Sequence, residues 1–525
     1  MQRWNGWGDT TRDATVPAGL PVLLDRVLGP GTPPLDAGLA DVLRRLPAPR
    51  LAAGGGLSTD PEDRLRHARG QSFPDLVALR SGQVGAVPDA TALPTSAQDV
   101  RGLLRRADEL DAVVVPYGGG TSVVGGVTTP VSERPVLAVD LRRMQRLERL
   151  DERSLLASFG AGVVGADLEA QLRSHGLTLG HYPQSFEHST LGGWVATRSA
   201  GQQSLGSGRI EDLFAGGRLE APGGRLDLPP FPASATGPDL RQVVLGSEGR
   251  LGVLTEVTVR VRRLPEVDDV SAAFLPDWAA GVDAARALAQ DGHGLSMVRL
   301  SSGPETATGL VLAGRVGDLL SRLLAVRRLG PGRCLLLVGT TGSRTSAAQA
   351  RRRAAHVVRR RGGTWTGAAL GRVWQRQRFR QAYLRDRLWE LGYGVDTVET
   401  ATTWDRVPGL VARVEQALHG ALDEPVHVGT HLSHVYRSGS SAYTTVLFRL
   451  GSEPATTLER WRRLKTAATG AVVAAGGTVS HQHGVGIDHR DAVVRAQGPS
   501  GTAVLAAALG ALDPDGRMNP GKLLP

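Results

Sequence analysis

Two glycine-rich clusters, about 70 residues apart, constrain this chain more than any other feature of its sequence. Residues 116–126 read Pro-Tyr-Gly-Gly-Gly-Thr-Ser-Val-Val-Gly-Gly, and residues 189–201 contain Gly192-Gly193. Successive glycines leave backbone N–H groups free to surround an anion such as a pyrophosphate. One such run could be a plain turn, but two in order, followed by Gly246-Ser-Glu-Gly249, are hard to explain as turns. The sequence therefore predicts an anion site built from several loops.

A third glycine motif, Gly160-Ala-Gly-Val-Val-Gly165, matches the dinucleotide fingerprint between an expected strand at 154–159 and an expected helix at 166–174. That fingerprint needs a ribose-binding acid roughly 20 residues further on. Residues 177–181 contain no acid. We therefore predict a tight strand-to-helix turn at 160–165 and no nicotinamide site.

The basic residues of this chain are nearly all arginine. Lys+Arg 61 against Asp+Glu 51 gives a net charge of +10, yet the only lysines are Lys465 and Lys522. The single Gly-Lys pair precedes Leu523, so a phosphate-binding loop of the ATPase type is excluded. Arginine clusters at 351–353 and 359–361 are interpreted as solvated helix faces, and we expect no nucleic-acid partner.

The single cysteine, Cys334, excludes an internal disulfide and any cysteine-rich metal site, which is typical of a reducing compartment. The first residues lack a basic start followed by an apolar run, and no stretch of 18 apolar residues occurs. We expect a cytoplasmic protein. A length of 525 residues allows two to four domains.

Hydrophobic periodicity predicts an α+β protein. Residues 1–84 look like a peripheral extension, and strands and helices then alternate to about residue 261. An apolar strand at 112–115 is expected to end at Pro116. In the second half we expect helices at 278–290, 317–328, 347–361 and 502–512, and strands at 334–338 and 445–448 in an antiparallel sheet.

Motifs spread over the whole chain resemble one known family. They are Arg3-Trp-Asn-Gly-Trp-Gly8, the loop at 116–126, Gly180-His-Tyr-Pro-Gln-Ser-Phe-Glu187, Gly192-Gly193-Trp194, Ile210-Glu211-Asp212, Thr236-Gly-Pro-Asp239, Gly246-Ser-Glu-Gly249, Tyr383-Leu-Arg-Asp386, Thr403-Trp-Asp-Arg406, Ser480-His-Gln-His-Gly-Val-Gly486 and Asn519-Pro-Gly-Lys522. The chain resembles the FAD-binding flavoproteins of the vanillyl-alcohol oxidase and p-cresol methylhydroxylase fold. Within that fold it is most similar to the alkyldihydroxyacetonephosphate (alkylglycerone-phosphate) synthases and their bacterial relatives.

The resemblance implies a two-subdomain FAD-binding fold with an α+β cap domain built on an antiparallel sheet. The expected parts are an N-terminal extension (1–84), the FAD-binding domain (85–264), a substrate or cap domain (265–480) and a C-terminal segment (481–525) that returns to the flavin. FAD would be bound non-covalently. The implied cofactor-binding residues are Pro116, Gly118, Gly119, Gly120, Thr121, Ser122, Ser189, Thr190, Gly192, Gly193, Thr197, Ser199, Ala200, Glu248, Gly249, Gly252 and Val253. Relatives often have Tyr-Gly at the position of Ser207-Gly208, so the sequence departs from the family pattern there, and no flavin contacts are assigned to residues 205–209.

The resemblance also implies a catalytic set of Tyr443, Arg385, His481 and His483. An arginine fork suits a phosphate or carboxylate, and tyrosine and neutral histidine can pass protons. Gln482 stands where the synthases have a third histidine, and glutamine cannot act as a base.

A zinc site is the alternative interpretation of the histidines, because His427 and His431 would face one side of a strand. No cysteine ligand and no clear carboxylate pattern accompany them, so no metal is predicted.

Two reactions remain open. In the first, the acyl group of an acyl-dihydroxyacetone phosphate is exchanged for a fatty alcohol, with the flavin as a covalent trap at N5 and no net redox change. In the second, a 2-hydroxy acid or glycerol 3-phosphate is dehydrogenated. A flavin-holding protein without turnover is disfavoured, because all four catalytic residues are present. We expect a small substrate with a phosphate or carboxylate, a lipid-like substrate with peripheral membrane contact, and a homodimer.

Overall fold

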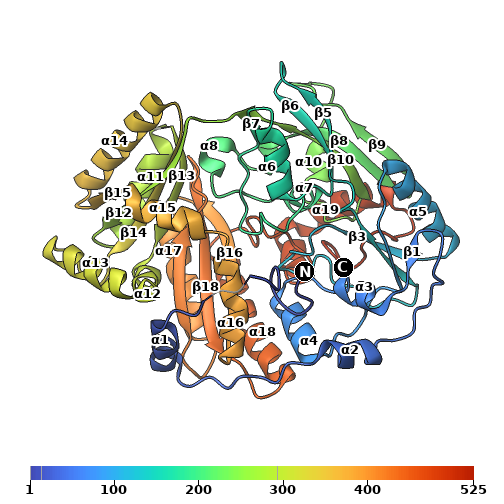
Figure 1. Ribbon diagram of the computed structural model, residues 1–525, viewed down its shortest axis with the longest axis horizontal. Coiled ribbons are helices and arrows are strands. Elements are labelled where there is room, and N and C mark those ends of the chain that lie inside the picture. Colours follow the sequence, from blue (N-terminus) through green and yellow to red (C-terminus); the bar gives the residue numbers. More distant parts are fainter. Residues whose placement is uncertain (1, 13–14, 293) are drawn as a thin grey trace.

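The computed structural model describes residues 2–12, 15–292 and 294–525, and it divides into a half with two small sheets and a half with one large sheet (Figure 1). The first sheet has the strand order β1-β2-β4-β3. Its strands are β1 (Leu57–Ser58), β2 (Ala90–Ala92), β3 (Val113–Tyr117) and β4 (Val136–Asp140). Strands β2, β4 and β3 are parallel, which fits their almost continuous burial.

Helix α5 (Ala97–Glu109) packs on this sheet through Val100 and Leu104. It begins with a capping box in which Ser96 and Asp99 satisfy each other's backbone N–H groups. Strand β3 runs through Pro116 instead of ending before it, because β3 lies at the edge of the sheet, where a missing N–H costs no ladder bond.

The second sheet is antiparallel, with the order β5-β6-β10-β8-β9. Its strands are β5 (Leu147–Asp151), β6 (Leu156–Gly160), β8 (Phe214–Ala221), β9 (Gly224–Leu228) and β10 (Val253–Arg260), and β7 (Leu177–Thr178) pairs with β11 (Arg262–Arg263) beside it. The helices of this part are α6 (Gly165–Arg173), α7 (Leu191–Thr197), α8 (Ser204–Ser207), α9 (Ile210–Leu213) and α10 (Leu240–Val244). The turn predicted at 160–165 is confirmed, since it joins β6 directly to α6.

The large sheet is antiparallel throughout, as predicted, with the order β15-β12-β14-β13-β17-β18-β16. Its strands are β12 (Val267–Leu275), β13 (Leu295–Ser301), β14 (Cys334–Gly342), β15 (Thr364–Gly367), β16 (Tyr393–Thr403), β17 (His427–Leu432) and β18 (Gly439–Arg449). The helices here are α11 (Trp278–Gln290), α12 (Gly303–Leu312), α13 (Gly314–Val326), α14 (Arg344–Arg360), α15 (Ala368–Gln377), η1 (Gln381–Tyr383), α16 (Leu384–Glu390), α17 (Val407–His419) and α18 (Pro454–Ala474). The largest buried apolar cluster lies between this sheet and its helices.

The segment 1–84 is woven into both halves and is not peripheral. It contains α1 (Gly19–Leu28), α2 (Leu39–Arg45), α3 (Pro61–Arg66) and α4 (Phe73–Ser81) and supplies β1 to the first sheet. Phe73 of α4 packs against Trp389, Phe448 and Trp461 of the cap. Burial of these aromatic rings stabilises the joint between the halves.

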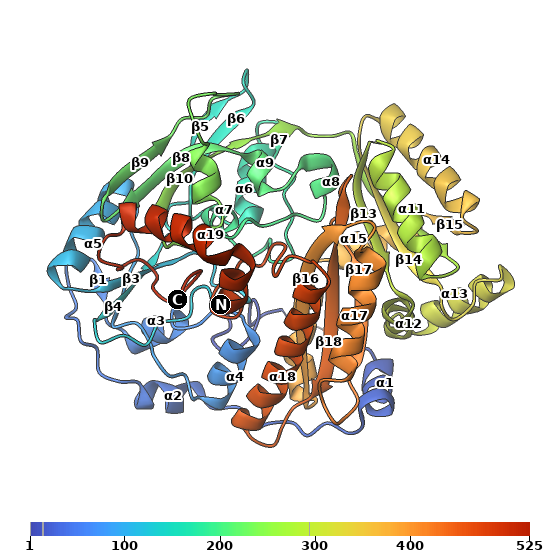
Figure 2. The ribbon, with the colours of Figure 1, turned by 180° about the vertical axis from the view of Figure 1, so that it is seen from behind.

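The last segment, residues 481–525, returns to the first half of the molecule (Figure 2). Helix α19 (Arg490–Leu512) is longer than predicted and kinks at Gly498, just before Pro499. Beyond it, Met518 pairs with Val114 of the edge strand β3. None of the helices in the described part of the chain is long and apolar enough to cross a membrane.

Candidate cofactor and active site

The first two glycine clusters lie against each other. A Cβ atom added to Gly119 would be 1.9 Å from the carbonyl oxygen of His188. One added to Gly120, whose φ is +67°, would be 2.1 Å from the Tyr117 hydroxyl. Only glycine fits at either position, because two backbones meet at Gly119, and at Gly120 the positive φ and the Tyr117 side chain exclude a Cβ. The predicted convergence of these two loops is therefore present.

The loop at 118–123 offers a row of backbone donors. Among the described residues, no hydrogen bond is made to the N–H groups of residues 118–123. Ser122 Oγ accepts from Gly126 N at 2.9 Å, which bends the loop into a concave shape. Consecutive unpaired amides in such a concavity fit an anion. These residues therefore fit the pyrophosphate of FAD.

Thr190 closes one side of this loop. Its hydroxyl would be 2.4 Å from a Cβ on Gly118, and it accepts from Gly193 N at 3.3 Å at the start of α7. The Ser189 hydroxyl accepts from the Trp194 indole at 2.7 Å. These bonds hold residues 189–193 against the glycine loop.

Glu248 joins the site to the C-terminal segment. Its buried carboxylate accepts from the N–H groups of Val485 and Gly486, the latter at 2.7 Å. Burial raises the pKa of Glu248 to about 7 against the opposing effect of these amides. Asn519 Nδ2 donates to the carbonyl oxygens of Glu248 at 2.7 Å and Gly126 at 3.0 Å. Four chain segments are thereby tied together.

Lys522, one of the two lysines, is only 1% exposed beside this junction. Burial lowers its pKa to about 8, while the charges of Asp75 and Glu248 partly offset that effect. The other lysine, Lys465, donates to Asp396 at 3.2 Å in the cap. Lys522 is therefore buried and Lys465 half-buried, so the exposed long basic side chains are arginines.

Three further predicted residues line the path from this junction to the cap. Thr197 Oγ1 donates to the Gly193 carbonyl oxygen at 2.9 Å, and Ser199 Oγ lies 2.7 Å from His181 Nε2. Ala200 N donates to Gln482 Oε1 at 3.0 Å. Gln482 thus fixes the histidine loop against the cofactor half.

The remaining predicted residues have a more structural environment. Pro116 lies against Gly249, whose added Cβ would be 3.1 Å from the proline ring. A Cβ on Gly252 would be 2.5 Å from the Glu220 carbonyl oxygen, and the Val253 side chain is buried in the core of the first subdomain. The side chain of Val253 therefore contributes packing.

A carboxylate that sequence reasoning missed lies between His481 and His483, the two histidines predicted to be catalytic. Glu399 Oε1 is 3.1 Å from His481 Nδ1, and Glu399 Oε2 is 3.5 Å from His483 Nε2. Burial alone would raise the pKa of Glu399, but the charges of His483 and His481 outweigh it and lower the pKa to about 2. The available signal was one acid in the otherwise uncharged stretch 397–404.

Tyr436 is the second missed residue. Its hydroxyl lies 2.6 Å from His481 Nε2, and the Trp404 indole donates to its backbone carbonyl at 3.0 Å. Because a carboxylate can only accept, His481 Nδ1 carries the proton towards Glu399, and Nε2 is left to accept from Tyr436. His483, Glu399, His481 and Tyr436 form a continuous polar row. The Trp-Asp-Arg motif thus positions the end of that row.

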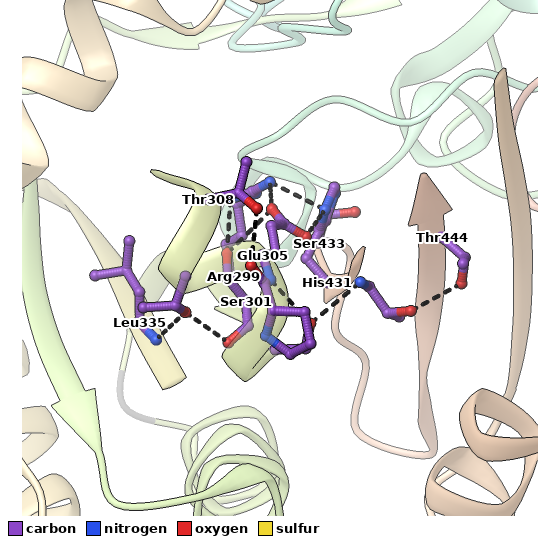
Figure 3. Close-up of polar contacts among 12 residues, drawn as sticks. Arg299, Ser301, Glu305, Thr308, Leu335, His431, Ser433 and Thr444 are labelled. Carbon is purple, nitrogen blue, oxygen red and sulfur yellow. Dashed lines mark hydrogen bonds and ion pairs between the residues drawn. The ribbon is translucent and has the colours of Figure 1, made fainter. Parts of the chain in front are cut away.

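Tyr443 lies on the other side of His483. Its ring stacks on His431 at a centroid distance of 4.8 Å and meets His483 edge-on at 5.8 Å. His431 Nδ1 is 2.9 Å from Glu305 Oε2 and 3.0 Å from Arg299 Nη2. Figure 3 shows these three side chains together. Burial raises the pKa of the Tyr443 phenol. The phenol therefore stays protonated and can donate a hydrogen bond.

Arg385 has an environment that the sequence did not predict. Its guanidinium donates to the backbone carbonyl oxygens of Gln71 at 2.5 Å and Ser72 at 3.3 Å. The adjacent Asp386 instead pairs with Arg80 at 2.9 Å and accepts from Trp7 N at 2.9 Å. The Tyr-Leu-Arg-Asp motif thus holds the opening tryptophan motif, and the Arg385 fork is not engaged by a carboxylate in the described residues.

His427 and His431, the two histidines considered as zinc ligands, have separate hydrogen-bond partners. His427 Nε2 lies 2.9 Å from Thr308 Oγ1, apart from the Glu305–His431 pair. Ligand atoms of Glu399, His434 and His481 lie within 4.8 Å of one another in the described chain. Both nitrogens of His481 already have protein partners. The geometry favours a hydrogen-bonded carboxylate–imidazole pair.

A cavity of about 1070 Å³ opens where the two halves meet. Its lining includes Thr197 and Glu248 from the predicted cofactor set, and Tyr436, His481 and Arg406 from the cap and the C-terminal segment. Tyr443, His483 and Arg385 are not among its lining residues in the described chain. Tyr436 is therefore the end of the polar row that reaches the cavity.

Comparisons with known proteins identify the families that this chain matches. Residues 88–226 match the FAD binding domain family, and residues 264–523 match the family of FAD linked oxidases, C-terminal domain. An alkyldihydroxyacetonephosphate synthase of Trypanosoma brucei brucei is 30% identical over 570 residues, covering 100% of this chain and 92% of that protein.

Two solved structures have the same fold as this chain. An alkyldihydroxyacetonephosphate synthase superposes with a TM-score of 0.85 at 26% identity, over 99% of this chain and 98% of the other. p-Cresol methylhydroxylase, at 15% identity, shares the fold with a TM-score of 0.68 over 89% of this chain and 93% of that one. The chain is thus an FAD-binding enzyme of the FAD-linked oxidase type and belongs to the alkyldihydroxyacetonephosphate synthase family.

Proposed function

We propose that the protein replaces the acyloxy group of an acyl-dihydroxyacetone phosphate with the alkoxy group of a fatty alcohol and releases the fatty acid, without net oxidation. Family membership supports this assignment. The observation that carries it is the polar row from His483 to Tyr436, which ends in a cavity of about 1070 Å³. Bound FAD supplies an electrophilic isoalloxazine ring, and the residues of this chain supply positioning and proton transfer.

The polar row is arranged to move one proton at a time. Glu399 holds the proton on His481 Nδ1, so His481 Nε2 is available to take the Tyr436 proton or one from a substrate. When His481 becomes charged, the neighbouring carboxylate stabilises the imidazolium. Tyr436 then acts as the group at the cavity wall through which a proton enters or leaves.

Gln482 takes no part in this proton transfer. Its side-chain oxygen accepts from Ala200 N, which positions the loop between the two histidines. The row therefore works with two histidines, and Gln482 does not interrupt it because Glu399 is the residue that lies between them, hydrogen-bonded to His481 and within ion-pair distance of His483.

The alternative function is dehydrogenation of a 2-hydroxy acid or glycerol 3-phosphate. Gln482, in place of the third histidine of the synthases, is the observation in its favour. In that case His483 would be the base that removes the hydroxyl proton.

Anaerobic mixing with each candidate substrate separates the two reactions. We expect label from a fatty alcohol to enter alkyl-dihydroxyacetone phosphate while the flavin absorbance remains that of the oxidised form. Tyr443→Phe should abolish this exchange with the flavin still oxidised. Bleaching of the flavin by glycerol 3-phosphate or a 2-hydroxy acid, with no alkyl exchange, would establish the dehydrogenase instead, and His483→Ala should then slow that bleaching by roughly 10²–10⁴-fold.

Arg385→Lys tests the anion site. Lysine keeps the charge but loses the bidentate fork, so if a substrate phosphate or carboxylate docks there, kcat/KM should fall by an amount equivalent to about 1–3 kcal/mol. FAD content should stay unchanged, because Arg385 contacts residues 71 and 72 and no glycine loop. An unaltered kcat/KM would move the phosphate or carboxylate site to another cation, with Arg406 in the cavity lining as the next candidate.

A lipid-like substrate implies peripheral contact with a membrane, and we include that contact in the proposal. Non-covalent attachment of FAD, a homodimer and a cytoplasmic location stay predictions from the sequence. Gel filtration and acid release of the flavin test the first two.

A further inference from the structure

His431 lies in a row of side chains that crosses four strands of the large sheet. Ser301 of β13 is directly opposite His431 of β17. His431 is opposite Tyr443 of β18, and Tyr443 is opposite Glu399 of β16. Directly opposite residues of antiparallel strands project from the same face of the sheet. The rings of His431 and Tyr443 are nearly parallel, at 18°, so these two titratable side chains extend from the sheet side by side.

Glu305 fixes the tautomer of His431. A carboxylate can only accept, so His431 Nδ1 donates to Glu305 Oε2 at 2.9 Å. Arg299 Nη2 can only donate, and it binds the other carboxylate oxygen, Glu305 Oε1, at 2.7 Å (Figure 3). Ser301 Oγ donates to that oxygen at 3.2 Å. Burial raises the pKa of Glu305, but the charges of His431 and Arg299 outweigh it and lower the pKa to about 2, so the carboxylate stays charged.

The Nε2 atom of His431 is left without a protein partner. No residue in the described part of the chain forms a hydrogen bond with it. The His431 side chain is 12% exposed, and solvent reaches Nε2, in contrast to the unpaired and fully buried Nδ1 atoms of His181 and His489. An imidazole whose Nδ1–H is held by a carboxylate and whose Nε2 is open has the arrangement of a general base.

We propose that His431, oriented by Glu305, accepts a proton from a substrate hydroxyl held beside Tyr443. The inference rests on the proposed function for the identity of that hydroxyl, which belongs to the fatty alcohol. The O–H bond of the alcohol breaks, its electron pair stays on the alcohol oxygen, and the proton moves to His431 Nε2. Glu305 stabilises the imidazolium, and the proton then leaves with the released fatty acid or passes to water. The protonated Tyr443 phenol donates to substrate while His431 accepts.

The surroundings of His431 keep it in the form that accepts a proton. Burial and the charge of Arg299 lower the pKa of His431, while the charges of Glu305 and Glu399 oppose that change. A lowered pKa leaves the imidazole neutral at neutral pH. The charged and titratable groups that face His431 are Arg299 of β13, Glu305 of α12, Tyr443 of β18, Glu399 of β16, and His434 just after its own strand.

His431→Phe in the FAD-bound enzyme separates proton transfer from packing. Phenylalanine keeps an aromatic ring against Tyr443 but cannot accept a proton. We therefore expect kcat for alkyl exchange to fall by roughly 10²–10⁴-fold, with little change in KM and with wild-type flavin content. In His431→Gly, added imidazole should restore part of the lost rate, because the free base can take the place of the missing ring.

Glu305→Gln tests the orienting carboxylate, and it does so even if His431→Phe folds poorly. Glutamine can still accept from His431 Nδ1 but has no charge, so the pKa of His431 should fall further. Since a base works in its neutral form, the acidic limb of the exchange rate should move to lower pH while its maximum decreases.

His427→Phe is the matched control. His427 is on the same strand, but it lies opposite Leu447, and its Nε2 is 2.9 Å from Thr308 Oγ1. This variant should keep the wild-type rate and pH profile.

A wild-type kcat in His431→Phe would overturn the inference. A slow His431→Gly that imidazole does not restore, together with an unmoved acidic limb in Glu305→Gln, would also overturn it, because His431 would then only pack against Tyr443. Bleaching of the wild-type flavin without alkyl exchange would instead refute the proposed function. The variants are then measured in that bleaching reaction, where an unchanged rate in His431→Phe overturns the inference and a slowed rate supports it.

Discussion

Gly119→Val should yield a folded protein without flavin. The valine Cβ would lie 1.9 Å from the His188 carbonyl oxygen, so the two loops would have to separate and the row of free amides would be broken. A β-branched side chain would also fill space that the pyrophosphate needs. The expected result is a colourless protein that releases no FAD on heat denaturation. Gly120→Val should behave in the same way, because the φ of residue 120 is positive, and a valine there would be strained.

Gly102→Val is the control for this experiment. Gly102 lies on α5 in the same subdomain, and a Cβ added there meets nothing within 4 Å. It should remain yellow with an unchanged ratio of flavin to protein absorbance. Normal FAD content in Gly119→Val would show that the pyrophosphate binds away from this loop.

Glu399→Gln should lower kcat by roughly 10²–10⁴-fold, the usual effect of a correctly held general base. Glutamine keeps the size of the side chain but removes the negative charge beside His481 and His483, a charge that raises the pKa of His483. A base works in its neutral form, and without Glu399 the pKa of His483 falls further. The acidic limb of the activity profile should therefore move to lower pH while the maximum decreases. FAD content should not change.

Glu459→Gln is the matched control, because Glu459 is exposed on α18 and pairs only with Arg462 at 3.6 Å in the described chain. Its rate and pH profile should match those of the wild type. If Glu399→Gln loses rate with no movement of the acidic limb, Glu399 supports packing and not proton transfer.

Much of the fold could be predicted because local signals and tertiary packing agree. Helix α11 has the predicted bounds, and the strand at 334–338 lies inside β14. Pro116 misled the strand assignment, since only the sheet order reveals that β3 is an edge. The role of residues 1–84 was also hidden, because the packing of Phe73 against the cap joins residues more than 300 positions apart.

In the candidate site, too, some residues could be predicted from the sequence and others only from the structure. The glycine loops, the histidines and Tyr443 have distinctive residue types and spacing, so the sequence indicates them directly. Glu399 and Tyr436 are single residues on a strand and a loop, and their importance arises only from distances of 3.1 and 2.6 Å to His481. For Arg385 the motif identified the residue, but the sequence could not show that its guanidinium donates to the backbone carbonyl oxygens of Gln71 and Ser72.

The contacts of Asn519 with Gly126 and Glu248 also bear on how the protein matures. During synthesis, the glycine loops emerge from the ribosome long before Asn519 does. Glu248 lacks its amide donors until Val485 and Gly486 have emerged, and β3 lacks its Met518 partner until almost the whole chain is made. Cofactor loading should therefore be a late, post-translational event, and nascent chains that stall before residue 519 should accumulate in a flavin-free form that quality-control proteases recognise.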